Sequence, residues 1–241
     1  MKTVLFDLFE TLVSHFDPAW EPPLRSTAER LGVEQTFYDA HWGRFDKDWQ
    51  AGTIEHYEQA LGELCAAAGV QPDARVLAEL RQEYIAYAAR TAFVEPAPEI
   101  VEMLTALKSV GVKLGVVTNA NNLDTAPWAQ YELAPFFDVF VASHQVRLLK
   151  PEPKIYELAC QRLRIEAGEA VFVGDGESNE LWGASEAGLE AFWCTWFLDR
   201  WPEGIRPNGF PGDDWRQYPS QSESPYKRLY RPEDLLITIL S

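Results

Sequence analysis

Short apolar runs and longer amphipathic stretches alternate along most of this 241-residue chain. The runs TVLF, KLGVVT and AVFVG are rich in β-branched residues, and each is bounded by polar or turn residues. Such runs are typical of interior strands in a parallel sheet, because both faces of that sheet are covered. We expect two further strands in the segments FDVFVAS and EAFWCTWF.

Segments with helical periodicity separate these predicted strands. Two of them keep apolar residues at intervals of three and four, namely Ile100, Met103, Leu104, Leu107 and Val110 in the first, and Ile155, Leu158, Ala159 and Leu163 in the second. Gly111 directly follows the first set and is expected to end that helix. Alternating strands and helices predict an α/β fold with a doubly wound parallel sheet, which binds ligands at the carboxyl ends of its strands.

Residues 15–93 break this alternation, because nearly all of them follow helical periodicity. One apolar stripe holds Tyr57, Ala60, Leu61, Leu64, Cys65 and Ala68, and another holds Leu77, Leu80, Tyr84, Tyr87 and Ala88. A helical block inserted directly after the first strand should lie over the strand ends as a lid. We therefore predict a core made of residues 1–14 and 94–241, and a helical cap at residues 15–93.

The stretch at residues 198–232 is rich in Pro, Gly, Ser and Trp and follows neither period. A structureless stretch of this length is unusual inside a compact domain. We expect an irregular extension of the core, either strapped down by its aromatic residues or partly mobile. The segment PEDLLITIL that follows it predicts a short closing helix.

Composition and charge narrow the classes of partner. The formal net charge of -16 argues against nucleic acid and anionic membranes, which bind basic surfaces, but it leaves small anionic substrates open. The cysteines are Cys65, Cys160 and Cys194, which lie far apart and are expected to be reduced. We find no secretory signal and no run of roughly 20 apolar residues. The sequence predicts a cytoplasmic monomer or homodimer.

Polar side chains that could take part in catalysis or ligand binding follow three of the predicted strands. Asp7 ends the first, Thr118 and Asn119 end the second, and Asp175 ends the strand in VFVGDG. Lys150 stands at the start of the helical segment in LLKPEPKIYELA. Carboxylates, a hydroxyl and an ammonium group at one sheet edge can hold a divalent cation and an anionic group together.

These motifs, in this order and at these distances, resemble the haloacid dehalogenase superfamily of hydrolases, of the type with a helical cap inserted after the first motif. The resemblance covers residues 2 to about 195 and implies a Rossmann-like core. It implies that Asp7 is a nucleophile, forming a covalent aspartyl intermediate that water then cleaves. It also implies that Thr118 hydrogen-bonds the transferring group, that Asn119 contacts substrate, and that Lys150 neutralises charge.

The resemblance further implies a Mg²⁺ site formed by Asp7, Asp175 and the backbone carbonyl of Phe9. Glu180 stands where a second metal-binding carboxylate belongs in VGDGESNELWGASEAG, and we include it among the expected ligands. The other reading of Glu180 is an acidic residue favoured by the dipole of a helix N-terminus.

The sequence departs from the family pattern at Phe9. Phosphatases of the superfamily usually carry an Asp there, which protonates the leaving alcohol, whereas haloacid dehalogenases carry an aromatic residue and no metal. The acidic fourth motif, with Asp175 and Glu180, favours a Mg²⁺-dependent phosphatase that acts on a small phosphorylated metabolite. A metal-independent 2-haloacid dehalogenase is the alternative. A non-catalytic binding or regulatory member of the fold is a further alternative.

Two other residues have both a functional and an ordinary interpretation. Glu10 follows Phe9 and would replace the missing acid if its side chain turned inward, whereas an ordinary loop residue would be exposed. Arg44 lies on a predicted helix whose apolar face carries Tyr38, Trp42, Phe45 and Trp49. It either belongs to a solvated face or reaches from the cap to a substrate carboxylate or phosphate.

Overall fold

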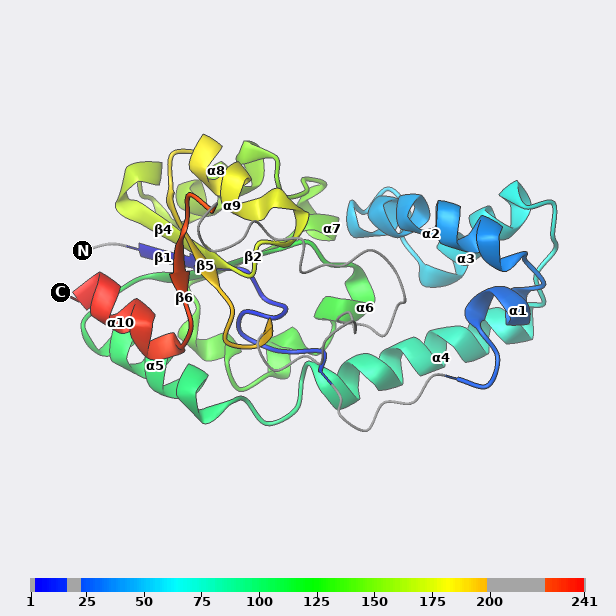
Figure 1. The fold of residues 1–241 in the computed structure, drawn as a ribbon, viewed down its shortest axis with the longest axis horizontal. Coiled ribbons are helices and arrows are strands. Elements are labelled where there is room, and N and C mark those ends of the chain that lie inside the picture. Colours follow the sequence, from blue (N-terminus) through cyan, green and yellow to red (C-terminus); the bar gives the residue numbers. More distant parts are fainter. Residues whose placement is uncertain (1–2, 17–22, 199–223, 241) are drawn as a thin grey trace.

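The computed structural model describes residues 3–16, 23–198 and 224–240 (Figure 1). Within these residues the core holds a six-stranded sheet of order β3-β2-β1-β4-β5-β6, in which every neighbouring pair is parallel. The strands are β1 (Thr3–Phe6), β2 (Leu114–Thr118), β3 (Val139–Ala142), β4 (Ala170–Gly174), β5 (Glu190–Cys194) and β6 (Lys227–Leu229). The strand order reverses between β1 and β4, and this confirms the predicted doubly wound sheet.

The centre of the sheet is formed by β1, β2 and β4, which are buried along their whole length. Phe6 of β1 pairs with Val116 on one side and with Val173 on the other. This register brings the carboxyl ends of the three strands to the same edge of the sheet. The residues at or just beyond those ends are therefore neighbours in space although they are far apart in the sequence.

Helices cover both faces of the sheet (Figure 1). Successive residues of a strand point to opposite faces. Accordingly, Phe6 belongs to the apolar cluster under α5 (Pro98–Ser109) and α10 (Pro232–Leu240). Leu5 belongs to the cluster under α8 (Pro153–Leu163) and α9 (Glu180–Glu186). The shorter elements are α6 (Asn122–Thr125), α7 (Ser143–Val146) and the 3₁₀ helices η1 (Trp128–Gln130), η2 (Ala134–Phe136), η3 (Ala167–Glu169) and η4 (Glu177–Asn179).

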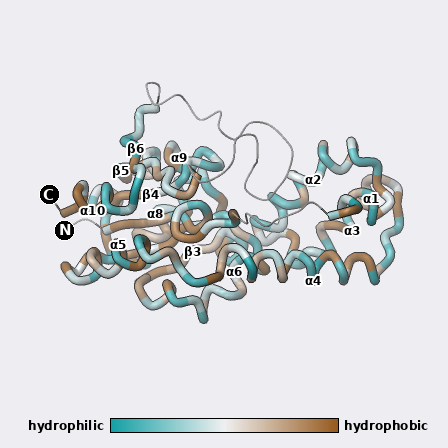
Figure 2. The backbone as a smooth tube through the Cα atoms, turned by 60° about the horizontal axis from the view of Figure 1, so that its bottom comes forward, coloured by the Kyte–Doolittle hydropathy of each residue, from teal (hydrophilic) through white to brown (hydrophobic). Residues whose placement is uncertain are grey.

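The block between β1 and α5 is helical, as the periodicity predicted, and it has an apolar cluster of its own. Its helices are α1 (Thr27–Leu31), α2 (Gln35–Gln50), α3 (Tyr57–Ala67) and α4 (Ala74–Thr91). Trp49, Leu61 and Leu64 are fully buried in this cluster. Hydrophilic and hydrophobic segments alternate along α4 in Figure 2, as in a helix with one packed side. The exact boundaries of the cap stay a prediction.

Polar contacts join the cap helices to the segment that follows β2. The Trp49 indole on α2 donates a hydrogen bond of 2.8 Å to the Asn122 side chain, and the Tyr84 hydroxyl on α4 donates one of 2.6 Å to Asp124. Because α6 starts only a few residues after Thr118, these contacts place the cap beside the carboxyl ends of the strands.

The C-terminal part of the chain corrects one expectation. Residues 227–229 lie in the stretch expected to be irregular, yet they form β6, which pairs with β5. The apolar pattern failed because this short edge strand, KRL, carries two cations. Most of the rest of the expected irregular stretch, residues 199–223, lies outside the described residues. The predicted closing helix is confirmed as α10.

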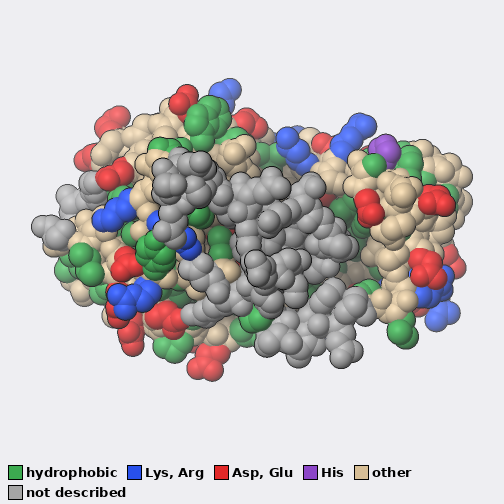
Figure 3. Space-filling view, in the orientation of Figure 1, with side chains coloured by type: hydrophobic (Ala, Val, Ile, Leu, Met, Phe, Trp, Pro, Cys, Tyr) green, Lys and Arg blue, Asp and Glu red, His purple; other side chains and the backbone are tan. Residues whose placement is uncertain are grey.

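The lengths of the helices and the distribution of surface charge bear on possible partners. None of the helices in the described ranges is long and apolar enough to cross a membrane. Acidic and basic side chains are dispersed over both the core and the cap on the face shown in Figure 3.

Candidate active site

Buried polar side chains gather where β1, β2 and β4 end. Asp7 directly follows β1, Thr118 is the last residue of β2, and Asp175 directly follows β4. All three are buried, as are Lys150 and Glu180. A buried group of this kind, at the switch point of a doubly wound sheet, is the expected position of an active site.

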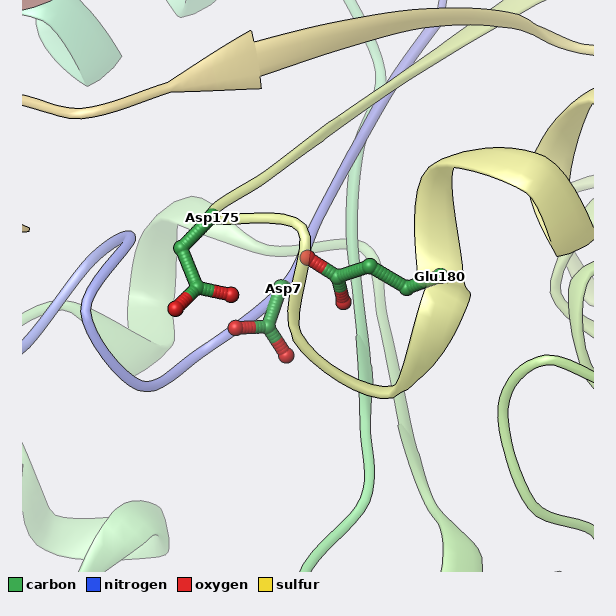
Figure 4. A group of neighbouring side chains, drawn as sticks. All are labelled: Asp7, Asp175 and Glu180. Atoms are coloured by element: carbon green, nitrogen blue, oxygen red, sulfur yellow. The ribbon is translucent and has the colours of Figure 1, made fainter. Parts of the chain in front are cut away.

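Three carboxylates of this group form a candidate cation site (Figure 4). One oxygen from each of Asp7, Asp175 and Glu180 lies within 4.8 Å of the other two. Figure 4 shows Asp7 between the other two side chains, with Glu180 reaching across from α9. Carboxylate oxygens are the ligands that Mg²⁺ prefers, so the donor set fits this metal.

Glu180 reaches the site because of the glycine before Asp175. A Cβ atom at Gly174 would lie 2.0 Å from Glu180 Oε1, so any side chain there would displace the carboxylate. The backbone N–H of Gly176 donates a 3.0 Å hydrogen bond to the same oxygen. Glycine at position 174 therefore allows the carboxylate to pack against the backbone.

Charge is concentrated in this buried site. Burial, with repulsion from Glu180, raises the pKa of Asp175 well above its ordinary value. Burial also raises the pKa of Glu180 to about 7, although the attraction of Lys150 works in the opposite direction. The raised pKa values mean that ionising these carboxylates costs free energy in the buried site. A bound cation would reduce that cost.

Lys150 supplies positive charge at the centre of the group. Its ammonium nitrogen forms ion pairs with Asp7 and Glu180. Burial alone would lower the pKa of Lys150, but the attraction of these two carboxylates outweighs burial and raises it above its ordinary value. Lys150 therefore stays charged at neutral pH. We expected Lys150 to begin the helix, but α8 begins at Pro153 and Lys150 lies in the loop before it.

Asn119 fixes the backbone of Lys150. Its side-chain NH₂ group donates a 3.0 Å hydrogen bond to the backbone carbonyl of Lys150, and the backbone N–H of Lys150 donates one of 2.8 Å to the side-chain oxygen Oδ1 of Asn119. Both polar groups of this side chain are thus used to place Lys150. The contact between Asn119 and a substrate stays a prediction.

Thr118 offers a hydroxyl for a ligand. The side chain is fully buried, and its oxygen is the single buried side-chain N or O atom without a hydrogen-bond partner in the described residues. An unsatisfied buried hydroxyl costs about 1–3 kcal/mol, so such groups are rare unless a ligand satisfies them. The expected role of Thr118, binding a transferring group, stays a prediction.

Phe9 and Glu10 turn toward the start of the cap. The Phe9 ring stacks on the His15 ring, with centroids 4.5 Å apart, and His15 in turn stacks on Tyr87 of α4 at 6.2 Å. Burial lowers the pKa of His15 to about 4, so this ring is neutral at physiological pH. Sequence reasoning could not find this stack, because its rings come from two segments that are far apart in the sequence, the loop after β1 and α4.

Glu10 is buried rather than exposed, with a left-handed φ of 54°. Its carboxylate accepts hydrogen bonds from the Ser14 hydroxyl at 2.8 Å and from the His15 N–H at 2.7 Å. These contacts tie together the loop that follows Asp7. The catalytic interpretation of Glu10, as a replacement for the missing acid, stays a prediction.

Arg44 is not gathered with the strand-end residues. It lies on the exposed side of α2, with its guanidinium carbon 5.7 Å from the centre of the Phe45 ring. The expected reach of Arg44 to a substrate stays a prediction.

Two buried aromatic residues support the site and were missed by sequence reasoning. The Tyr156 hydroxyl donates a 2.8 Å hydrogen bond to the backbone carbonyl of Glu180. The Trp193 indole donates one of 2.8 Å to the backbone carbonyl of Asp175. Both residues fit the apolar pattern of the core, which shows nothing of a polar contact.

Comparisons with known proteins agree with this geometry. A family model described as haloacid dehalogenase-like hydrolase matches residues 1–188. The chain is 28% identical over 199 residues to glyceraldehyde 3-phosphate phosphatase of Methanopyrus kandleri, covering 78% of this chain and 82% of the relative. It is also 28% identical over 204 residues to (S)-2-haloacid dehalogenase of Pseudomonas sp. strain YL, covering 81% and 82%.

A solved structure shares the fold. It is a variant of a HAD family enzyme from Bacteroides thetaiotaomicron in complex with magnesium and inorganic phosphate. The TM-score is 0.56 at 16% identity, with 91% of this chain and 100% of that chain covered. The strand-end site, the cap and the family match over residues 1–188 agree, and the chain belongs to the haloacid dehalogenase-like hydrolases.

Proposed function

We propose that this hydrolase is a Mg²⁺-dependent phosphatase that acts on a small phosphorylated metabolite. The observation that carries the proposal is the buried set of carboxylates from Asp7, Asp175 and Glu180, whose oxygens lie within 4.8 Å of one another. A single ammonium group, that of Lys150, pairs with two of them. A bound divalent cation would balance the remaining negative charge and would leave the site able to accept a phosphate.

Asp7, Asp175 and Glu180 would hold Mg²⁺, with the Phe9 carbonyl as an expected further ligand. When bound, the cation offsets negative charge on the phosphoryl group and so allows a carboxylate to approach it. The relative from Methanopyrus kandleri is named a phosphatase, which supports the same reaction class.

The chain's own residues then perform two displacements. A carboxylate oxygen of Asp7 attacks phosphorus, the bond from phosphorus to the leaving oxygen breaks, and that oxygen departs with the electron pair. Water next attacks phosphorus, and the bond between phosphorus and the Asp7 oxygen breaks with its electron pair returning to the carboxylate. Inorganic phosphate leaves, and the protons of the attacking water pass to the phosphate or to solvent. The Thr118 hydroxyl and the Lys150 ammonium stabilise the phosphoryl oxygens during both steps.

Phe9 determines which phosphates should react well. A phenyl ring cannot protonate a leaving alkoxide, and a general acid typically contributes about 10²- to 10⁴-fold. We therefore expect acyl and aryl phosphates, whose leaving groups need no proton, to be cleaved faster than alkyl phosphates.

Hydrolytic dehalogenation of a 2-haloacid is the second candidate, because Phe9 is aromatic and one relative is named a dehalogenase. Phosphate release from a panel of phosphorylated metabolites and halide release from 2-chloropropionate, measured on one preparation, separate the two reactions. We expect phosphate release that EDTA abolishes and Mg²⁺ restores. Halide release that is insensitive to EDTA would establish the alternative.

The same panel tests the proposal that the chain is only a binding or regulatory protein. Activity that is lost in Asp7→Asn would exclude that reading. Failure to turn over any phosphate or haloacid would instead support it.

A further inference from the structure

The backbone on which the acidic site is built is held by a residue outside the motifs. Trp193 is buried on β5 and pairs in register with Gly174, the residue before Asp175. Its indole N–H donates a 2.8 Å hydrogen bond to the backbone carbonyl of Asp175. Trp193 therefore contacts the chain at the point where β4 ends and the acidic loop begins.

One peptide group joins Trp193 to Glu180. The carbonyl of the peptide between Asp175 and Gly176 accepts from Trp193, and the N–H of the same peptide donates to Glu180 Oε1 at 3.0 Å. Hydrogen bonds in such a chain polarise one another, so the donor at one end strengthens the contact at the other. The orientation of this peptide thus sets the place of Glu180 as well as that of Asp175.

The loop beyond this peptide needs such support. Gly176, Ser178 and Asn179 have φ values of 94°, 56° and 54°, in the left-handed region. For residues other than glycine this conformation is uncommon and is maintained by surrounding contacts. A fixed peptide at the start of the loop therefore restricts where α9 begins.

The Trp193 ring is itself held in place by β6. Arg228 pairs in register with Trp193, and its guanidinium carbon lies 5.0 Å from the centre of the indole ring. The same guanidinium lies 4.6 Å from the Tyr230 ring, and its Nε donates a 2.8 Å hydrogen bond to the Thr195 hydroxyl. Cation–π contacts of this kind are attractive, and they fix the indole in the plane that aims its N–H at Asp175.

We propose that Trp193 is a positioning residue of the metal site, whose indole N–H sets the positions of the Asp175 and Glu180 carboxylates. This inference rests on the proposed function, because it requires that these carboxylates bind Mg²⁺. Trp193 and Arg228 lie beyond residues 1–188, which the family model matches. Strand β6 thus contributes to the metal site indirectly, because Arg228 positions the Trp193 ring and that ring positions the acidic loop.

Isothermal titration of Mg²⁺ into the metal-free protein, without substrate, tests the proposal. Trp193→Phe keeps an aromatic ring and removes the N–H. Loss of a contact that orients a metal ligand typically weakens binding about 10- to 100-fold, and we expect about tenfold here because the contact is to backbone. Trp128→Phe is the matched control, since Trp128 is also buried but packs on Phe140 and Phe137 in the core. It should bind Mg²⁺ as the wild type does.

A second variant covers the case in which Trp193→Phe does not fold. Arg228→Met removes the guanidinium from the indole face and leaves the N–H in place. We expect a smaller loss of Mg²⁺ affinity in the same direction, of about threefold. Urea unfolding of each variant measures its stability, so that a loss of affinity can be compared with a loss of stability.

The outcomes separate this inference from the proposed function. The positioning role is overturned if Trp193→Phe binds Mg²⁺ with unchanged affinity. If Trp193→Phe does not fold, unchanged affinity in Arg228→Met overturns it instead. Either result leaves the phosphatase proposal standing. An equal loss in Trp128→Phe overturns the positioning role too, because the effect would then be one of core packing. Wild-type protein that binds no Mg²⁺ overturns both proposals.

Discussion

Gly174→Ala perturbs the acidic site through a single added carbon. The new Cβ would lie 2.0 Å from Glu180 Oε1, 2.7 Å from Glu180 Cδ and 2.9 Å from a ring carbon of Phe172. Non-bonded heavy atoms are most favourable at about 3.5–4.0 Å, so the Glu180 carboxylate must retreat by more than about 1 Å. It cannot do so without stretching its contacts with Lys150 and Gly176.

The size of the effect follows from that displacement. A misplacement of about 1 Å in a catalytic group typically costs about 10²-fold in rate, which corresponds to about 2.7 kcal/mol of transition-state stabilisation. We therefore expect kcat/KM for phosphate release to fall about 100-fold in Gly174→Ala, with weaker activation by Mg²⁺.

Steady-state phosphate release at several Mg²⁺ concentrations measures this effect. Gly168→Ala is the matched control, because a Cβ at Gly168 meets no atom within 4 Å, and it should keep wild-type kinetics. Urea unfolding of both variants distinguishes a displaced carboxylate from an unfolded protein. A folded Gly174→Ala variant with wild-type rate and Mg²⁺ dependence would refute the role given to Glu180.

Three further predictions concern the leaving group, pH and the cap. Phe9→Asp should raise turnover of alkyl phosphates by about 10²-fold and of aryl phosphates much less, as parallel rate measurements would show; equal gains would contradict the missing acid. Burial, with repulsion from Asp124, raises the pKa of Asp46 to about 7 in the native protein, whereas Asp in the unfolded chain ionises at about pH 4. The native state therefore holds a proton that the unfolded state loses, and the free energy of unfolding falls as the pH rises from about 4 to about 7. Asp46→Asn should therefore be more stable than wild type by about 1–2 kcal/mol at about pH 8 but not at about pH 4, measured by urea unfolding at both pH values; a gain that is independent of pH would contradict this assignment. Gly62→Ala, at a position on α3 where a Cβ meets no atom within 4 Å, should raise the free energy of unfolding by about 0.5–1 kcal/mol, and a loss would show that the cap does not tolerate the methyl group.

The sequence predicted the parts of the fold that rest on local pattern. Apolar runs identified β1, β2 and β4, because strands buried on both faces are apolar throughout. Asp7, Thr118 and Asp175 could be placed at one edge, because parallel strands end together. The helical period identified α3 and α4 of the cap, whose buried faces include Leu61 and Leu80 as expected.

The contacts that complete the site could not be predicted from pattern. An indole that donates to a backbone carbonyl, as Trp193 does, has the same apolar signature as a core residue. The stack of Phe9, His15 and Tyr87 joins segments far apart in the sequence. Glu10 is buried because of a left-handed backbone and local hydrogen bonds, neither of which hydropathy reports.

In the proposed reaction, Asp7 attacks phosphorus and carries the phosphoryl group. Mixing the protein with acetyl phosphate and Mg²⁺, quenching in acid and measuring the masses of the peptides tests it most directly. We expect a phosphoryl group on the peptide that contains Asp7, and we expect none after EDTA treatment or in Asp7→Asn. A peptide that stays unmodified with acetyl phosphate, but on treatment with 2-chloropropionate and EDTA gains a 1-carboxyethyl ester at Asp7 with release of chloride, would contradict it.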